Sequence, residues 1–134
     1  MANFISEDDI ERALLAKLKN SFGYEMLNCH TSDRDDLNDK SGRTNKREVI
    51  LVDLLRDSLI RLNPDLPAAT IENVIERMTE KRRGLSPVLG NREVDDLIRN
   101  GVQVQYDDAD GQKQSVIAKV IDFEQVGRNR FLAV

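Results

Sequence analysis

Several residue types are scarce in this chain of 134 residues, which has no tryptophan, one cysteine and one histidine. Cys29 cannot form a disulfide within the chain, so nothing in the sequence requires an oxidising compartment. A structural zinc site needs four ligands, and the adjacent His30 is the only histidine available to help Cys29. Neighbouring side chains in an extended segment point apart, which argues against a Cys-His catalytic pair. We interpret Cys29 as a small core residue beside a polar one.

An excess of positive charge is also missing, because the formal charge at pH 7 is −4. Proteins that hold a nucleic-acid backbone unaided usually carry a strong basic excess. Any DNA contact by this chain must therefore be local or shared with other segments. Basic residues cluster at Arg43, Lys46 and Arg47, at Lys81, Arg82 and Arg83, and at Arg128 and Arg130. We favour solvated surface charges for these clusters, with phosphate contact as the alternative.

Long apolar runs are absent, and the N-terminus has no basic segment followed by an apolar one. We expect a cytoplasmic protein that does not enter a membrane. The chain also lacks a Gly-x-x-x-x-Gly-Lys-Ser/Thr phosphate loop, which excludes a nucleotide-binding motor of that type. The acidic stretch Asp33–Asp39 has the wrong spacing for a calcium loop, so we interpret it as a solvated surface loop.

The pattern of apolar residues predicts an α+β fold, with 134 residues in one domain. The helical N-terminal part is expected to pack on an antiparallel β-hairpin and a further strand. Ser6 should cap the first helix, with Asp9 in the capping-box position and Gly23 near its end. Helices are also predicted over 46–62, from Pro67 to a C-terminal turn at 81–84, and over 91–100 after a break at 86–87. Strands are predicted over 24–29, 102–106, 116–123 and 131–134.

Glu11 has an unusual predicted position. Placing residues at 100° per step puts it inside the apolar arc of the first helix, between Leu15 and Leu18. A buried charge must be paired, hydrogen-bonded or bound to a metal. A salt bridge to an arginine is one interpretation. The other is a helix-borne carboxylate facing a metal site that strand residues complete.

The last four residues, Phe131–Val134, are all apolar. A chain seldom ends on such a strand, because its side chains need covering. We therefore expect this sequence to be the front part of something longer.

Five short motifs run along the chain in a recognisable order. They are Ser6–Glu11 with Gly23-Tyr24, Val49–Leu51 leading to Leu62–Pro64, Asn91–Glu93 with Leu97–Val102, Val120–Phe123, and Asn129–Val134. Together they resemble the N-terminal region of the type I restriction enzyme R (restriction, or motor) subunit. The resemblance covers essentially the whole chain.

The resemblance implies the front part of a PD-(D/E)xK nuclease fold, truncated before its catalytic motif. The family is a type I site-specific deoxyribonuclease that cleaves unmodified DNA together with modification (methyltransferase) and specificity subunits. Mg²⁺ and ATP are expected for the full-length subunit and neither for this chain. No Asp or Glu here is followed two residues later by Lys, so the family's Glu-x-Lys is missing. Glu11 matches the family's acid on the first helix, and we expect the fragment alone to be inactive.

A different class of function stays open beside the nuclease interpretation. The chain could be a non-enzymatic interaction module that docks on the modification subunit or another partner, which would complete its last strand. An Asp followed by a Glu-x-Lys on adjacent strands beyond Val134 would distinguish the two.

Overall fold

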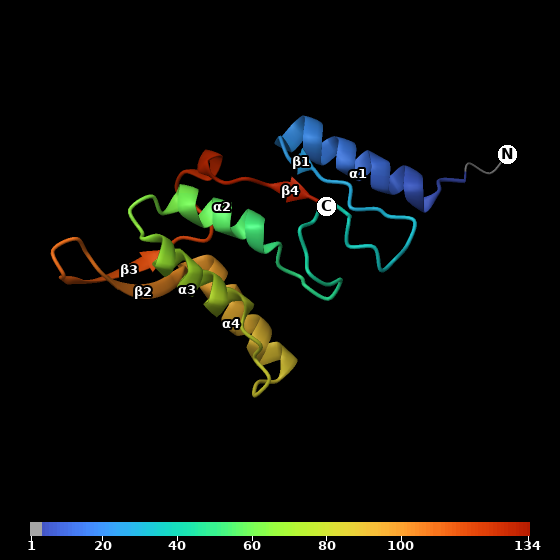
Figure 1. Cartoon of the computed structure of the whole chain (residues 1–134). Coiled ribbons are helices and arrows are strands. Elements are labelled where there is room, and N and C mark those ends of the chain that lie inside the picture. Colours follow the sequence, from blue (N-terminus) through green and yellow to red (C-terminus); the bar gives the residue numbers. More distant parts are fainter. Residues whose placement is uncertain (1–3) are drawn as a thin grey trace. The chain divides into compact units, whose positions relative to one another are not determined.

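The computed structural model describes residues 4–134 (Figure 1). Helices and strands follow in the order α1 (Glu7–Phe22), β1 (Glu25–Met26), α2 (Val52–Leu62), α3 (Ala68–Thr79), α4 (Pro87–Asn100), β2 (Val102–Asp107), β3 (Lys113–Ala118), the 3₁₀ turn η1 (Val126–Arg128) and β4 (Leu132–Ala133). This order confirms the α+β class. The chain forms two compact units. Unit 1 contains the residues up to Lys46 with Arg130–Val134, and unit 2 is Arg47–Asn129.

Unit 1 begins with α1, whose start the sequence predicts correctly. The Ser6 hydroxyl accepts a hydrogen bond from the Asp9 amide, and the Asp9 carboxylate accepts one from the Ser6 amide. These hydrogen bonds lower the pKa of Asp9, the side-chain bond from Ser6 having the largest effect. Gly23 ends the helix in the left-handed region at φ 70°, where glycine has no Cβ to clash.

Two short strands complete unit 1. β1 pairs in parallel with β4, with Glu25 opposite Leu132 and Met26 opposite Ala133. The rings of Tyr24 and Phe131 stack at a centroid distance of 5.3 Å. The last strand thus joins the strand after the first helix, whereas the β-hairpin forms a separate two-stranded sheet.

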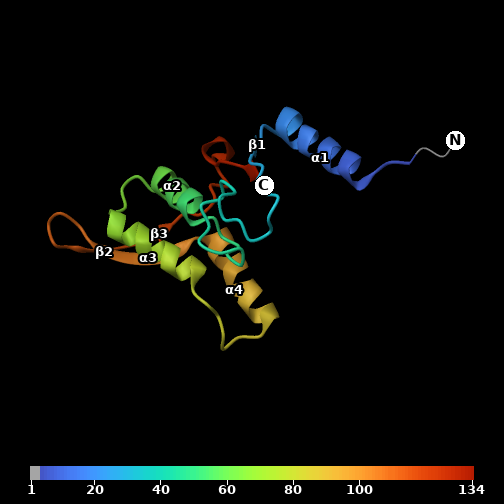
Figure 2. The same cartoon turned by 45° about the vertical axis from the view of Figure 1, so that its right-hand side comes forward.

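Unit 2 contains the hydrophobic core. Figures 1 and 2 show α2 and α3 lying side by side, with the β2–β3 hairpin next to α3. The hairpin is antiparallel and runs from the pair Val102–Ala118 to the pair Asp107–Lys113. The buried core residues come from all three helices and both strands of this unit: Leu59, Ile71, Val74, Ile75, Met78, Leu97, Val102 and Ala118. The helices of unit 2 therefore pack on the hairpin, as the apolar pattern predicts.

Two predicted helix starts are wrong, each because of a local polar interaction. The helix expected from Lys46 begins only at Val52. Lys46 Nζ instead lies 2.8 Å from a carboxylate oxygen of the buried Asp39, which holds it in the preceding loop. The helix expected from Asn91 already begins at Pro87. The Ser86 hydroxyl accepts from the Leu89 amide, and proline is well suited to a first helical turn, so Ser-Pro marks a start and not a break.

Two predicted ends are also wrong. The third helix stops at Thr79, before the basic turn expected to end it. The second hairpin strand spans Lys113–Ala118 and not 116–123. Asn63 stops this strand, because its side chain bonds both the amide and the carbonyl of Lys119 in place of a partner strand.

None of the helices in residues 4–134 has the length and apolar character needed to cross a membrane.

Candidate functional site

Glu11 lies on an exposed helix in unit 1. No residue of α1 is buried, and Glu11 is exposed. Its arc neighbours Leu15 and Leu18 are half-buried, while Leu14 is 56% exposed. The predicted burial of Glu11 is therefore wrong. Unit 1 offers α1 only two short strands and a polar loop, which is too little apolar surface to cover this face.

Neither the salt bridge to an arginine nor the metal site predicted for Glu11 is found among residues 4–134. No arginine pairs with it, and these residues nowhere bring together three His, Cys, Asp or Glu side chains that could hold a metal ion. The residues present thus do not fit a complete magnesium site. A metal role for Glu11 stays a prediction that needs ligands from other chain segments.

The acidic loop uses its carboxylates to hold its own backbone. Asp33 accepts from the Asp35 amide at 3.0 Å, and Asp36 accepts from the Asn38 amide at 2.9 Å. Asp39 is buried and accepts from Lys46 and from the amide of Ser41. The bond from Lys46 contributes most to holding the pKa of Asp39 far below its ordinary value. The carboxylate of Asp39 is therefore engaged within the loop.

Cys29 and His30 form no site with other residues of the kind that binds metal within the described part of the chain. Cys29 is a free, half-buried thiol and His30 is exposed. Cys29 is therefore not the core residue that the sequence predicts, because it is only half-buried and lies outside the hydrophobic core.

The basic clusters divide into paired and unpaired members. Arg43, Lys46, Arg82, Arg128 and Arg130 each form an ion pair. Lys81 and Arg83 are exposed and form no ion pair within the described residues. The ion pairs give the paired arginines and Lys46 a structural role within the chain, and phosphate contact by the clusters stays a prediction.

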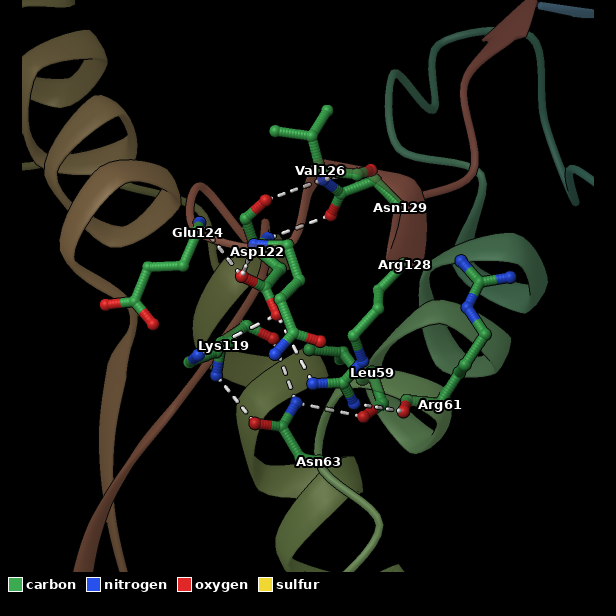
Figure 3. Close-up of polar contacts among 10 residues, drawn as sticks. Leu59, Arg61, Asn63, Lys119, Asp122, Glu124, Val126, Arg128 and Asn129 are labelled. Atoms are coloured by element: carbon green, nitrogen blue, oxygen red, sulfur yellow. Dashed lines mark hydrogen bonds and ion pairs between the residues drawn. The ribbon is translucent and has the colours of Figure 1, made fainter. Parts of the chain in front are cut away.

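Asp122 organises the most densely bonded polar cluster of unit 2 (Figure 3). Its side chain is 1% exposed and accepts from the amides of Glu124 and Gln125 at 3.1 and 2.9 Å. Arg128 donates to the other carboxylate oxygen at 3.3 Å. The carboxylate thus holds the segment between β3 and η1 in one conformation.

Two asparagines extend this cluster. Asn129 bonds the amide and the carbonyl of Asp122 at 2.8 and 2.7 Å. Asn63, at the end of α2, bonds the backbone of Lys119, and the Arg128 guanidinium donates to the carbonyl of Arg61. We call Asn63, Asp122, Arg128 and Asn129 the Asp122 cluster. It fixes the chain after β3 to the C-terminal end of α2.

The amide of Gln125 is the main reason why the pKa of Asp122 lies below its ordinary value of 3.8. Burial opposes this shift, while the Glu124 amide, Lys119 and Arg128 add to it. The sequence shows Asp122 only as a polar interruption in an apolar stretch. Its partners all lie within seven residues of it but at irregular intervals, so helix or strand periodicity could not find them.

The family model described as the type I restriction enzyme R protein N terminus matches residues 4–134. The chain belongs to this family. It is 32% identical over 130 residues to the type I restriction enzyme HindI endonuclease subunit of Haemophilus influenzae. That alignment covers 97% of this chain and 12% of the Haemophilus protein. No solved structure matches the chain. The family predicted from the five motifs is thereby confirmed.

Proposed function

We propose that this chain is the N-terminal part of a restriction subunit that contributes to ATP-dependent and Mg²⁺-dependent cleavage of unmodified DNA. The family match over residues 4–134 carries this proposal. The subunit would act in the cytoplasm, on DNA, with modification and specificity subunits as its partners. The name of the Haemophilus relative, an endonuclease subunit, supports the same class of activity.

Catalysis in this proposal requires residues beyond those of the present sequence. The fold would be the front part of a PD-(D/E)xK nuclease, but the sequence contains no Glu-x-Lys. Glu11 alone stands on a helix as a candidate metal ligand. Magnesium in such sites positions a water and neutralises charge on the phosphate. The role of this chain's own residues is to carry Glu11 on α1 and to support the sheet.

The first test concerns the isolated polypeptide. Purified 1–134 is expected to leave supercoiled plasmid intact in the presence of Mg²⁺, because its described residues lack a complete set of carboxylate ligands. Agarose gels of the incubated plasmid measure this. Nicking that depends on Mg²⁺ and follows the protein through every purification step would contradict the expectation.

The second test concerns Glu11 in the full-length subunit, assembled with its modification and specificity subunits. Glu11→Ala should lower DNA cleavage by about tenfold to a hundredfold, as loss of a residue that supports a bound metal does, and leave ATP hydrolysis unchanged. Asp8→Ala is the matched control, since Asp8 lies on the same helix in an exposed pair with Arg12. If Glu11→Ala cleaves DNA as fast as Asp8→Ala, Glu11 is not part of the proposed metal site.

A non-enzymatic docking role is the second candidate, favoured by the small sheet of unit 1. β1 and β4 contain two residues each and, within residues 4–134, pair only with one another. Sheets of this size need additional strands or packing for stability, which a partner protein could supply. Glu11→Ala distinguishes the candidates, because a docking module would keep full cleavage in that variant.

A further inference from the structure

The connection between α3 and α4 combines exposed apolar and cationic side chains. It runs out beyond the ends of the two helices (Figures 1 and 2). Leu85 is 41% exposed, Val88 68% and Leu89 49%. Around them in the sequence lie the exposed residues Lys81, Arg83 and Arg92. We call these six residues the α3–α4 tip.

Arg82 holds the backbone of this tip in place. Its guanidinium donates to the carbonyls of Arg77 and Glu80, both at 2.9 Å, and so satisfies groups at the end of α3. Its Nε lies 3.3 Å from a Glu93 carboxylate oxygen on α4, outside hydrogen-bond geometry. The Arg82 side chain is only 11% exposed. It connects the end of α3 with Glu93 on α4. The exposed residues therefore stand on a preorganised support, which lowers the entropic cost of binding.

The positive charges of the tip are not compensated locally. Lys81, Arg83 and Arg92 form no ion pair in the part of the chain that the structure describes. The first turn of α4 contains no acidic residue, although helix N-termini favour negative charge. The nearby acids Glu80 and Glu93 both face Arg82. The α3–α4 tip is therefore a local positive surface with an apolar centre, although the net charge of the chain is −4.

We propose that the α3–α4 tip docks an acidic, amphipathic segment of a companion protein subunit. Apolar side chains of that segment would cover Val88 and Leu89, and its carboxylates would pair with Arg83 and Arg92. This is the usual composition of a protein interface, with an apolar centre, enriched arginine and a polar rim. The inference rests on the proposed function, because it names a surface for the subunit's partners.

DNA is the less suitable occupant of this surface. Contacts to phosphates come from cationic and hydrogen-bonding groups, and they would leave the three apolar side chains of the tip in water. A protein segment covers the apolar centre and uses the same cations.

The test uses the full-length subunit and its modification–specificity complex as the probe. One variant combines Val88→Gln and Leu89→Gln, and another combines Arg83→Glu and Arg92→Glu. Ile60→Gln on α2, at a site 52% exposed, and Arg34→Glu in the exposed loop are the matched controls. Binding is titrated at low and high salt, and DNA affinity and the thermal midpoint are measured on the same preparations.

Each tip variant should weaken assembly by at least about tenfold, since central apolar and arginine residues dominate interfaces. The charge variant should also lose salt dependence, while the controls bind like the wild type. Unchanged assembly overturns the inference, and so does a loss of DNA affinity with intact assembly.

If the wild-type subunit joins no such complex, the proposed function fails as well. If a double variant unfolds, Arg83→Ala replaces it, because Arg83 is exposed and lies outside any helix; this variant should weaken assembly in the same way.

Discussion

Asp122 shows how a single buried carboxylate can replace regular secondary structure. Two backbone amides donate to it, and Arg128 and Lys119 lie within 3.3 and 3.8 Å. A buried carboxylate with several donors is stable in its charged form. If the carboxylate is replaced by a neutral group, some of these buried donors lose their acceptor. A buried donor without an acceptor costs more free energy than the loss of a hydrogen bond at the surface.

Asp122→Asn should therefore lower the thermal midpoint by several degrees, because an amide nitrogen replaces one acceptor oxygen. Differential scanning calorimetry at neutral pH measures this change. Asp107→Asn, at an exposed position of the hairpin, is the control and should unfold like the wild type. A midpoint unchanged in Asp122→Asn would show that the Asp122 cluster adds no stability.

The stability difference between the wild type and Asp122→Asn should also depend on pH. The folded-state pKa of Asp122 lies below 3.8, so its carboxylate stabilises the fold at pH values above the unfolded pKa. The contribution is lost as the pH falls through the folded pKa. The difference in unfolding free energy between wild type and Asp122→Asn should thus be full near pH 6 and shrink below about pH 4. A difference that grows on acidification would contradict this.

At the scale of the elements, the sequence predicts which helices and strands exist better than where they end. The Ser6 cap and the alternating strand after Gly101 are local signals, and both are confirmed. Among the wrong boundaries, the helix start marked by Ser86 rests on a local cap, whereas the boundaries at Lys46 and Asn63 rest on partners that the folded chain brings near. Side chains that bond a distant backbone leave no periodic signal in the sequence.

The join between α4 and β2 requires glycine. Gly101 has φ 81° and ψ 176°, a region that only glycine adopts without strain. A Cβ there would lie 2.5 Å from Ile117 Cγ2 and 2.6 Å from the Ala118 carbonyl oxygen. Side chains of any size would push the hairpin away from the helix.

Gly101→Ala should lower the free energy of unfolding by about 2 kcal/mol or more, through backbone strain and overpacking. Urea titration followed by circular dichroism measures the loss. Gly84→Ala is the matched control, because a Cβ at Gly84 would meet nothing within 4 Å. Equal stability of the two variants would show that the hairpin adapts to an added methyl group.

At the scale of the whole molecule, the buried core belongs to unit 2. Its residues come from α2, α3, α4 and the hairpin, all within Arg47–Asn129. α1 contributes no buried residue. The apolar pattern predicts the unit 2 core, but it also gives α1 an apolar arc, whose residues are not buried. Local periodicity measures how amphipathic a helix is and cannot show how much surface is available to cover it.

The fragment 47–129 should fold by itself and unfold cooperatively, since it is continuous and holds this core. The fragment 1–46 should have little stable structure, because β1 loses its partner β4. Thermal unfolding by circular dichroism and amide proton dispersion in NMR spectra test both. A gradual, non-cooperative transition of 47–129 would show that its core needs unit 1.

The parallel pairing of β1 with β4 has a consequence for the order of events on the ribosome. β1 emerges early, but its partner at Leu132 emerges only after the whole of unit 2. Chain segments fold as they are synthesised, from the N-terminus onward, so β1 must wait unpaired while the later unit acquires its core. The helix α1 thus belongs to a unit that can be completed only after all residues of unit 2 have been synthesised.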